Sequence, residues 1–159
     1  MSECWIASFG DTHGGLKYGL LMPQTVLHEQ SPEGDIVPFQ PKLTKTQEML
    51  LHLYREQIQA VIDLAAGVPV VVIHGGDLCH GKKHPAQLLS TRLSDQMLIG
   101  VDVLREWKRV PNLKAVRVLM GTEAHNEGEG SLELLAVEQL KPEMPIEISD
   151  HYRLTIPAD

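Results

Sequence analysis

The chain has 159 residues, 43% of them hydrophobic, and a net charge of -7 at pH 7. This length fits one domain with a sizeable buried core, and the composition is ordinary for a soluble globular chain. The negative charge excludes broad, nonspecific attraction to phosphate backbones and anionic membranes, because that attraction needs a positive field. Contact with nucleic acid must therefore be local or assisted by a metal ion.

Cysteine use and hydropathy indicate a protein of a reducing compartment. Cys4 and Cys79 are expected to be free thiols, since the sequence shows no signal peptide and no dense cysteine framework. No apolar run approaches the ~20 residues needed to span a bilayer. We expect a cytoplasmic protein without a membrane partner, and the sequence indicates no particular oligomeric state.

A first short strand is predicted over residues 4–9, and it ends at Gly10, Asp11, Thr12 and His13. Asp11 and His13 are two residues apart, so in extended backbone their side chains lie on the same side and can reach one ion. The alternative is a turn in which Asp11 bonds to backbone amides and His13 is exposed to solvent. Both interpretations are open for this segment alone.

Residues 16–41 show no hydrophobic period and are punctuated by prolines, which predicts a long loop. This loop either shapes substrate access or is a neutral insertion. A helix is predicted over residues 44–66, where apolar residues recur at steps of three and four. Thr44 and Gln47 fit a capping box at its start, and Gly67 fits its end.

The next strand, over residues 68–74, is an apolar run of β-branched residues that stops at Gly75 and Gly76. Such a run is typical of a parallel strand buried on both faces. Asp77 follows the carboxyl end of this strand, where open α/β sheets place their ligands. His74 lies inside the strand and is interpreted as a core histidine.

Four side chains that follow Asp77 are candidates for contact with substrate: His80, Lys82, Lys83 and His84. The two lysines are adjacent and can meet a phosphate, and solvated loop charges are the alternative. The two histidines can support a metal ligand or face the substrate, and ordinary surface histidines are the alternative.

The rest of the chain continues the alternation of strands and helices. The predicted elements are residues 85–109 (helix), 113–120 (strand), 131–140 (helix), and 146–149 and 152–156 (strands). The third strand again ends in a glycine, Gly121, which Thr122, Glu123 and His125 follow. No repeat or internal linker divides the chain, so residues 1–159 are expected to form one domain with an inserted loop.

Three predicted strand ends therefore carry residues of the metal-ligand type. The carboxyl ends of parallel strands lie at one edge of a sheet, so Asp11, His13, Asp77 and His125 can converge. Carboxylate oxygens with imidazole nitrogens suit Mn, Fe or Zn. A carboxylate that bridges two ions about 3.5 to 4 Å apart creates a two-metal site. Such a site activates a water molecule and stabilises both oxygens of a phosphoryl displacement. The pattern predicts phosphoester hydrolysis.

Three sequence blocks carry a resemblance to a known family. They are Gly10-Asp11-Thr12-His13, Gly76-Asp77-Leu78-Cys79-His80 and Gly121-Thr122-Glu123-Ala124-His125. In order and spacing they resemble the first three of the five signature blocks of calcineurin-like metallophosphoesterases. The second block is most similar to the DNA-repair exonuclease branch, and the third is similar to phage phosphoesterases.

The resemblance implies an α/β fold in which a two-layered β-sandwich is flanked by helices. It also implies two divalent metal ions, with Mn the first choice and Fe or Zn the alternatives. In this scheme Asp11 and His13 hold one ion, Asp77 bridges to the second, and His125 stabilises or protonates the leaving oxygen. Thr122 stands where the family has a ligating Asn, so Glu123 or Thr122 is expected to ligate instead.

The family's fourth and fifth blocks, which complete the second metal site, do not follow His125. We therefore expect the N-terminal part of a longer phosphoesterase, and a truncated or decayed gene is the alternative. The leading hypothesis is a phosphoesterase that cleaves phosphodiesters, nucleic acid among them, by attack of a metal-bound hydroxide. A second hypothesis is a non-catalytic interaction module that binds one metal ion or none. A third is a phosphomonoesterase.

Overall fold

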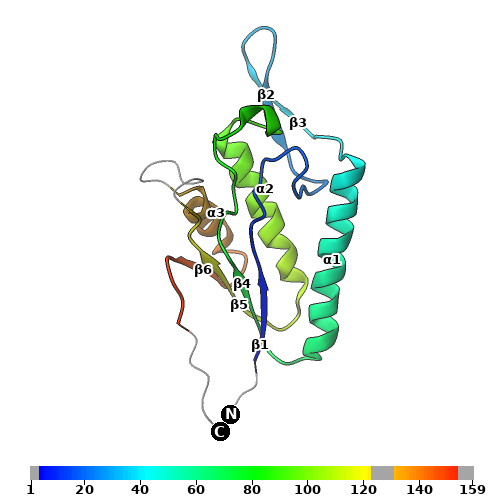
Figure 1. Ribbon diagram of the computed structural model, residues 1–159, viewed down its shortest axis with the longest axis vertical. Helices are drawn as coiled ribbons and strands as arrows, with labels where there is room; N and C mark the ends of the chain where they lie inside the picture. Colours follow the sequence, from blue (N-terminus) through cyan, green and yellow to red (C-terminus); the bar gives the residue numbers. More distant parts are fainter. Residues whose placement is uncertain (1–3, 123–130, 154–159) are drawn as a thin grey trace.

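The computed structural model describes residues 4–122 and 131–153, and a parallel sheet forms its centre (Figure 1). The strands are Trp5–Phe9 (β1), Leu27–Gln30 (β2), Ile36–Phe39 (β3), Val70–His74 (β4), Leu113–Leu119 (β5) and Ile146–Ser149 (β6). The helices are Lys45–Ala65 (α1), Leu93–Arg105 (α2) and Leu132–Leu140 (α3), with the short 3₁₀ helices Pro85–Gln87 (η1) and Glu106–Arg109 (η2). The central sheet has the strand order β1-β4-β5-β6, all parallel, and β2 and β3 form a separate antiparallel pair. The predicted α/β class is confirmed.

One face of the central sheet is buried along β4 and β5, and the other is partly open. Val72 and His74 of β4 are 0% exposed, as are Val116 and Val118 beside them on β5. Buried residues of all three α-helices join this face in one hydrophobic core. On the other face Ile6 of β1 is 47% exposed. Within residues 4–122 and 131–153 the second sheet is the two-stranded β2-β3 pair, so the described residues show the α/β class.

Helix α1 begins and ends as the sequence predicts. The hydroxyl of Thr44 accepts a hydrogen bond from the backbone nitrogen of Gln47 at 3.2 Å, and the Gln47 side chain accepts one from the backbone nitrogen of Thr44 at 2.9 Å. These two bonds satisfy donors that the first helical turn leaves without a partner. At the other end Ala66 and Gly67 have φ angles of 48° and 92°, which end the helix.

The prediction of one helix over residues 85–109 is wrong at its start. Pro85 opens only η1, and α2 begins eight residues later, at Leu93. The end of η1 and the segment that follows it pair with the loop after β1. The backbone nitrogen of Leu89 donates to the Gly15 carbonyl at 2.6 Å, and that of Lys17 donates to the Gln87 carbonyl at 2.9 Å. These bonds between segments take the place of helical ones.

The prediction of a long loop over residues 16–41 is wrong in part, because Leu27–Gln30 and Ile36–Phe39 form the β2-β3 hairpin. The hairpin projects from one end of the molecule (Figure 1). Two buried carboxylates of α2 hold its base. Asp102 accepts a hydrogen bond from the Thr25 hydroxyl at 2.7 Å, and Asp95 accepts one from the backbone nitrogen of His28 at 3.1 Å.

The two cysteines are free thiols, as predicted, with Cys4 exposed and Cys79 buried. Burial raises the pKa of the Cys79 thiol, which keeps it protonated and unreactive. In the described part of the chain no helix has the length and apolar character required to cross a bilayer. Of the strand predicted over residues 152–156, the described residues Tyr152 and Arg153 are not in a strand, and the remainder lies outside the described residues.

Candidate metal centre

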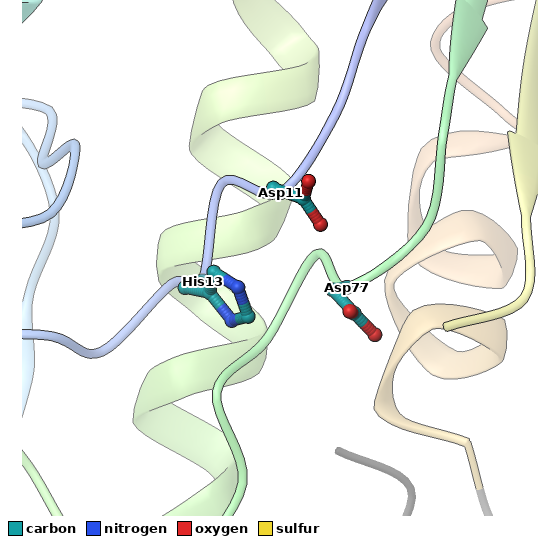
Figure 2. A group of neighbouring side chains, drawn as sticks. All are labelled: Asp11, His13 and Asp77. Atoms are coloured by element: carbon teal, nitrogen blue, oxygen red, sulfur yellow. The ribbon is translucent and has the colours of Figure 1, made fainter. Parts of the chain in front are cut away.

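Asp11, His13 and Asp77 meet at the carboxyl edge of the sheet, as the sequence predicts. Each offers one ligand atom, and these atoms all lie within 4.8 Å of one another. The side chains of Asp11 and His13 extend from the loop after β1 toward the loop after β4, which carries Asp77 (Figure 2). Asp11 is exposed, His13 is half-buried and Asp77 is buried. The cluster is therefore open to solvent on one side and anchored in protein on the other.

The backbone at all three residues is in the left-handed region. The φ angles are 52° at Asp11, 44° at His13 and 52° at Asp77. A non-glycine residue adopts this conformation at a cost on the order of 1 kcal/mol, so the surrounding structure must hold it there. It does so through backbone pairing of the two loops. The nitrogen of Asp11 donates to the Gly76 carbonyl at 3.2 Å, and that of His13 donates to the Asp77 carbonyl at 3.0 Å.

His74 is a partnered core residue, as predicted, and it links the two ligand loops. Its Nδ1 accepts a hydrogen bond from the backbone nitrogen of Gly76 at 3.2 Å, so the ring proton sits on Nε2. Nε2 then donates to the Thr12 hydroxyl at 3.2 Å, and this hydroxyl donates to the Leu78 carbonyl at 3.3 Å. Burial lowers the pKa of His74 to about 4, which keeps the ring neutral and this chain of bonds intact.

Asp77 is oriented by Thr122, which follows β5. Asp77 Oδ1 accepts a hydrogen bond from the backbone nitrogen of Thr122 at 2.7 Å and from its hydroxyl at 3.2 Å. The same hydroxyl lies 3.4 Å from Asp77 Oδ2. The third strand end therefore does meet the other two, and Thr122 is a direct neighbour of the expected bridging carboxylate.

Glu133 of α3 is a part of the site that sequence reasoning missed. Its carboxylate is 2% exposed and accepts hydrogen bonds from the backbone nitrogens of Leu78 and Gly121, each at 3.0 Å. The hydroxyl of Ser131 donates a third bond at 2.9 Å. In sequence Glu133 is an ordinary acidic residue in the first turn of a helix, a position that the helix dipole already explains. No pattern in the neighbouring sequence indicates that Glu133 belongs to the site.

Gly121 lies between the two buried carboxylates. A Cβ atom at this position would lie 2.5 Å from Glu133 Oε1 and 2.6 Å from Asp77 Oδ1. Real Cβ atoms do not approach oxygens so closely, so only glycine fits here without moving one of the two carboxylates. Gly121, which follows β5, thus allows Asp77 and Glu133 to lie close to the end of that strand.

The predicted substrate-contacting residues divide into one buried and three exposed side chains. His80 is 7% exposed, and its Nδ1 lies 3.4 Å from Nδ1 of His13, with the two rings edge to face. It is therefore part of the cluster's surroundings. Lys82, Lys83 and His84 are exposed on the loop that leads to η1. His84 has a φ angle of 52° and precedes η1 as its N-terminal cap.

Two predicted site residues, Glu123 and His125, lie outside the described residues. Within residues 4–122 and 131–153, the group formed by Asp11, His13 and Asp77 is the one set of three His, Cys, Asp or Glu residues that can hold an ion. Two carboxylates and an imidazole are hard and borderline ligands, which fit Mn, Fe or Zn. Comparison of the chain with known protein families, with curated proteins and with solved structures finds no match.

Proposed function

We propose that the chain is a metal-dependent phosphoesterase that hydrolyses phosphodiesters. The observation that carries the proposal is the convergence of Asp11, His13 and Asp77, with ligand atoms within 4.8 Å of one another, at the carboxyl edge of a parallel sheet. Each of these segments runs from a strand through a glycine to an aspartate and then a histidine. This order also resembles the signature blocks of calcineurin-like metallophosphoesterases. We extend the proposal to the sandwich fold of that family, in which a second sheet would cover the partly open face.

The chain's own residues have separate tasks in this reaction. Asp11, His13 and Asp77 would hold the two divalent ions, with Mn the first choice. When bound, such ions polarise the phosphoryl oxygens and lower the pKa of a water molecule. Thr122 fixes the orientation of the Asp77 carboxylate through bonds of 2.7 and 3.2 Å.

The remaining residues in the proposal act on the substrate and the leaving group. His125 would donate a proton to the leaving oxygen, and Glu123 would complete the ligand set beside Thr122. Asp11 lies on the exposed side of the cluster, so an incoming phosphate approaches from there. The exposed Lys82 and Lys83 can attract its charge from the adjoining loop.

A non-catalytic metal-binding module is the second candidate function. Three ligands suffice to hold one ion with solvent molecules in its remaining positions. In the described ranges, 4–122 and 131–153, the chain gathers a single group of this kind. This observation favours a site for one ion, which would lack the two-ion clamp of phosphoryl displacement.

The decisive experiment combines metal content with turnover. The protein is purified with Mn²⁺, dialysed, and measured for bound Mn by mass spectrometry and for hydrolysis of bis(p-nitrophenyl) phosphate. Asp77→Asn is the test variant, and Asp63→Asn, an exposed carboxylate of α1, is the matched control. The phosphodiesterase proposal expects two ions per chain, turnover in the wild type and in Asp63→Asn, and loss of both in Asp77→Asn.

Other outcomes select among the alternatives. One ion per chain without turnover supports the binding module and contradicts the enzyme. Faster turnover of p-nitrophenyl phosphate than of the diester contradicts the assignment to phosphodiesters. Turnover that survives in Asp77→Asn at the wild-type rate places the chemistry elsewhere and contradicts the proposed site.

A further inference from the structure

Strand β1 lies at an edge of the central sheet. In the part of the chain that the structure describes, β1 pairs with β4 on one side and with no strand on the other. Its residues, Trp5–Phe9, include no charged side chain and no proline. Natural proteins usually protect an edge strand with such residues, because its unpaired backbone groups can join another strand. The edge formed by β1 therefore lacks this protection.

The ladder with β4 determines which backbone groups of β1 point to the free side. The Phe9 carbonyl accepts a hydrogen bond from the Gly75 nitrogen at 2.7 Å, so the backbone groups of Phe9 point toward β4. These groups alternate in direction from one residue of a strand to the next. The N–H and C=O groups of Ile6 and Ser8 therefore point away from β4, toward the free side.

A groove of about 370 Å³ lies between β1 and helix α1, which Figure 1 shows beside the strand. Residues of β1, α1 and η2 line it, and none of them is charged: Ala7, Ser8, Phe9, Tyr54, Gln57, Ala60, Val61 and Trp107. Because three consecutive residues of β1 form one wall, the groove follows the edge of the sheet. A strand that pairs with β1 would thus find an apolar surface for its side chains.

The sequence of β1 is complementary to itself in one antiparallel register, in which Ala7 lies opposite Ala7 of a second copy. Ile6 then lies opposite Ser8 in two hydrogen-bonded pairs, which use the backbone groups that face the free side. Trp5 lies opposite Phe9 at a position without hydrogen bonds, where side chains approach most closely and aromatic pairs stabilise a sheet. The small side chain of Ala7 leaves room at the two-fold axis.

Exposure and charge favour a second copy as the occupant of this edge. Trp5 and Ile6 are large and apolar, yet they are 45% and 47% exposed. Trp5 is on the same face of β1 as Phe9, whose ring lies 5.9 Å from that of Tyr54 and 5.2 Å from that of Trp107. Trp5 of a second copy would therefore enter the groove beside these rings. Two copies with a net charge of -7 each repel one another, and an uncharged edge lets them meet without burying like charges.

We propose that the chain forms a two-fold symmetric dimer in which the β1 strands of two copies pair antiparallel about Ala7. Each copy inserts Trp5 into the groove of the other, and the two four-stranded sheets become one continuous sheet. Antiparallel strands have their carboxyl ends in opposite directions, so the two metal centres lie at opposite ends of the interface and share no ligand. The dimer is therefore independent of the proposed activity.

Cysteine cross-linking of the full chain tests the register. Cys4→Ser removes the exposed native thiol, and Cys79 is buried. In this background Ala7→Cys places the thiols of two copies opposite one another, at a pair whose Cα atoms lie about 4.5 Å apart, within reach of a disulfide. Ser8→Cys is the matched control, because Ser8 lies opposite Ile6 rather than itself. Mild oxidation is expected to convert the Ala7→Cys chain to a covalent dimer and to leave the Ser8→Cys chain mostly monomeric on a non-reducing gel.

Sedimentation equilibrium measures the dimer directly. At about 100 μM the wild type is expected to have twice the 17.7 kDa mass of one chain, and added salt is expected to strengthen the dimer by screening its like charges. Trp5→Ala is expected to raise the dimer Kd at least about 10-fold, since buried aromatic residues dominate the energetics of interfaces. Tyr18→Ala is the matched control, because Tyr18 is 72% exposed and does not line the groove.

Each outcome either supports the dimer or overturns it. A mass of one chain at every concentration overturns it, also where a strand of another protein occupies the edge. Equal dissociation of Trp5→Ala and Tyr18→Ala, or equal cross-linking of Ala7→Cys and Ser8→Cys, overturns the β1 interface. Should Trp5→Ala fail to fold, the comparison of the two cysteine variants decides alone. A dimer without phosphodiester turnover overturns only the proposed activity, and turnover by a monomer overturns only the dimer.

Discussion

Glu133 Oε1 accepts a hydrogen bond from the backbone nitrogen of Leu78 at 3.0 Å and so connects helix α3 to the loop that carries Asp77. The same carboxylate bonds to the end of β5 through the nitrogen of Gly121. One buried side chain thus fixes two of the three segments that meet at the metal centre, from a position 55 residues along the chain from Leu78.

Glu133→Gln is expected to lower the free energy of unfolding by about 1 to 3 kcal/mol, because an amide cannot accept from all three donors and leaves a buried N–H without a partner. Urea denaturation measures the change. Glu138→Gln on the exposed side of the same helix is the control, and its surface pair with Lys141 contributes at most about 1 kcal/mol. Equal losses in the two variants would contradict the role given to Glu133.

Gly121→Ala is expected to reduce Mn²⁺ affinity by about 10- to 100-fold, the usual effect of disturbing a group that orients a ligand. The added methyl would meet Asp77 Oδ1 at 2.6 Å and must displace that carboxylate. Gly75→Ala is the matched control, since its Cβ would make an ordinary contact of 3.6 Å with the Phe9 carbonyl. Calorimetric titration with Mn²⁺ compares the two. Unchanged affinity in Gly121→Ala would show that Asp77 is not a ligand in its present position.

Stability is expected to fall as the pH decreases from about 6.5 to about 4, because His74 titrates there only in the unfolded chain. Burial lowers the pKa of His74 in the folded state to about 4, from about 6.5 for an unperturbed histidine. Between these values the unfolded chain binds more protons than the folded chain does, so the free energy of unfolding rises with pH. It reaches its full value above about pH 6.5. The difference corresponds to a contribution on the order of 3 kcal/mol.

Urea denaturation at several pH values tests this expectation with a matched pair of variants. His74→Gln should show a smaller change between pH 6.5 and pH 4 than the wild type. His52→Gln should retain the wild-type change, because the His52 side chain is 70% exposed on α1. A profile in His74→Gln that matches the wild type would assign the pH dependence to other groups.

Mn²⁺ is expected to stabilise the folded chain by mass action. At a free concentration of 100 times its Kd, one bound ion raises the free energy of unfolding by about 2.7 kcal/mol. Thermal denaturation with and without Mn²⁺ measures the shift, and EDTA should reverse it. Asp11→Asn should lose most of the shift, whereas Asp63→Asn should keep it. Equal shifts in both variants would mean that Mn²⁺ binds outside the cluster.

The sequence predicted those features that depend on local chemistry. The run of β-branched residues ending at Gly75 marked β4, and the Thr44 and Gln47 pair marked the start of α1. Three strand ends carrying acidic and histidine residues predicted the cluster, because parallel strands leave little choice about which ends meet. Pattern and topology together therefore located Asp11, His13 and Asp77.

The features that sequence reasoning missed depend on contacts between distant residues. The hairpin is held by the Thr25 bond to Asp102, 77 residues away, and by the His28 bond to Asp95, 67 residues away. Pro38 lies within β3, and a proline argues against a strand when only local sequence is read. The start of α2 was misplaced for the same kind of reason, since pairing with the loop after β1 overrides the helical pattern near Pro85.

The left-handed backbone at Asp11, His13 and Asp77 has a consequence for the history of such a site. Glycine adopts this conformation freely, so it can replace a ligand with a gain of stability on the order of 1 kcal/mol and a loss of metal binding. Drift without selection for the ligands would therefore favour glycine, because most natural proteins lie close to the stability threshold. Two aspartates and a histidine at these positions are not the residues that stability alone would favour.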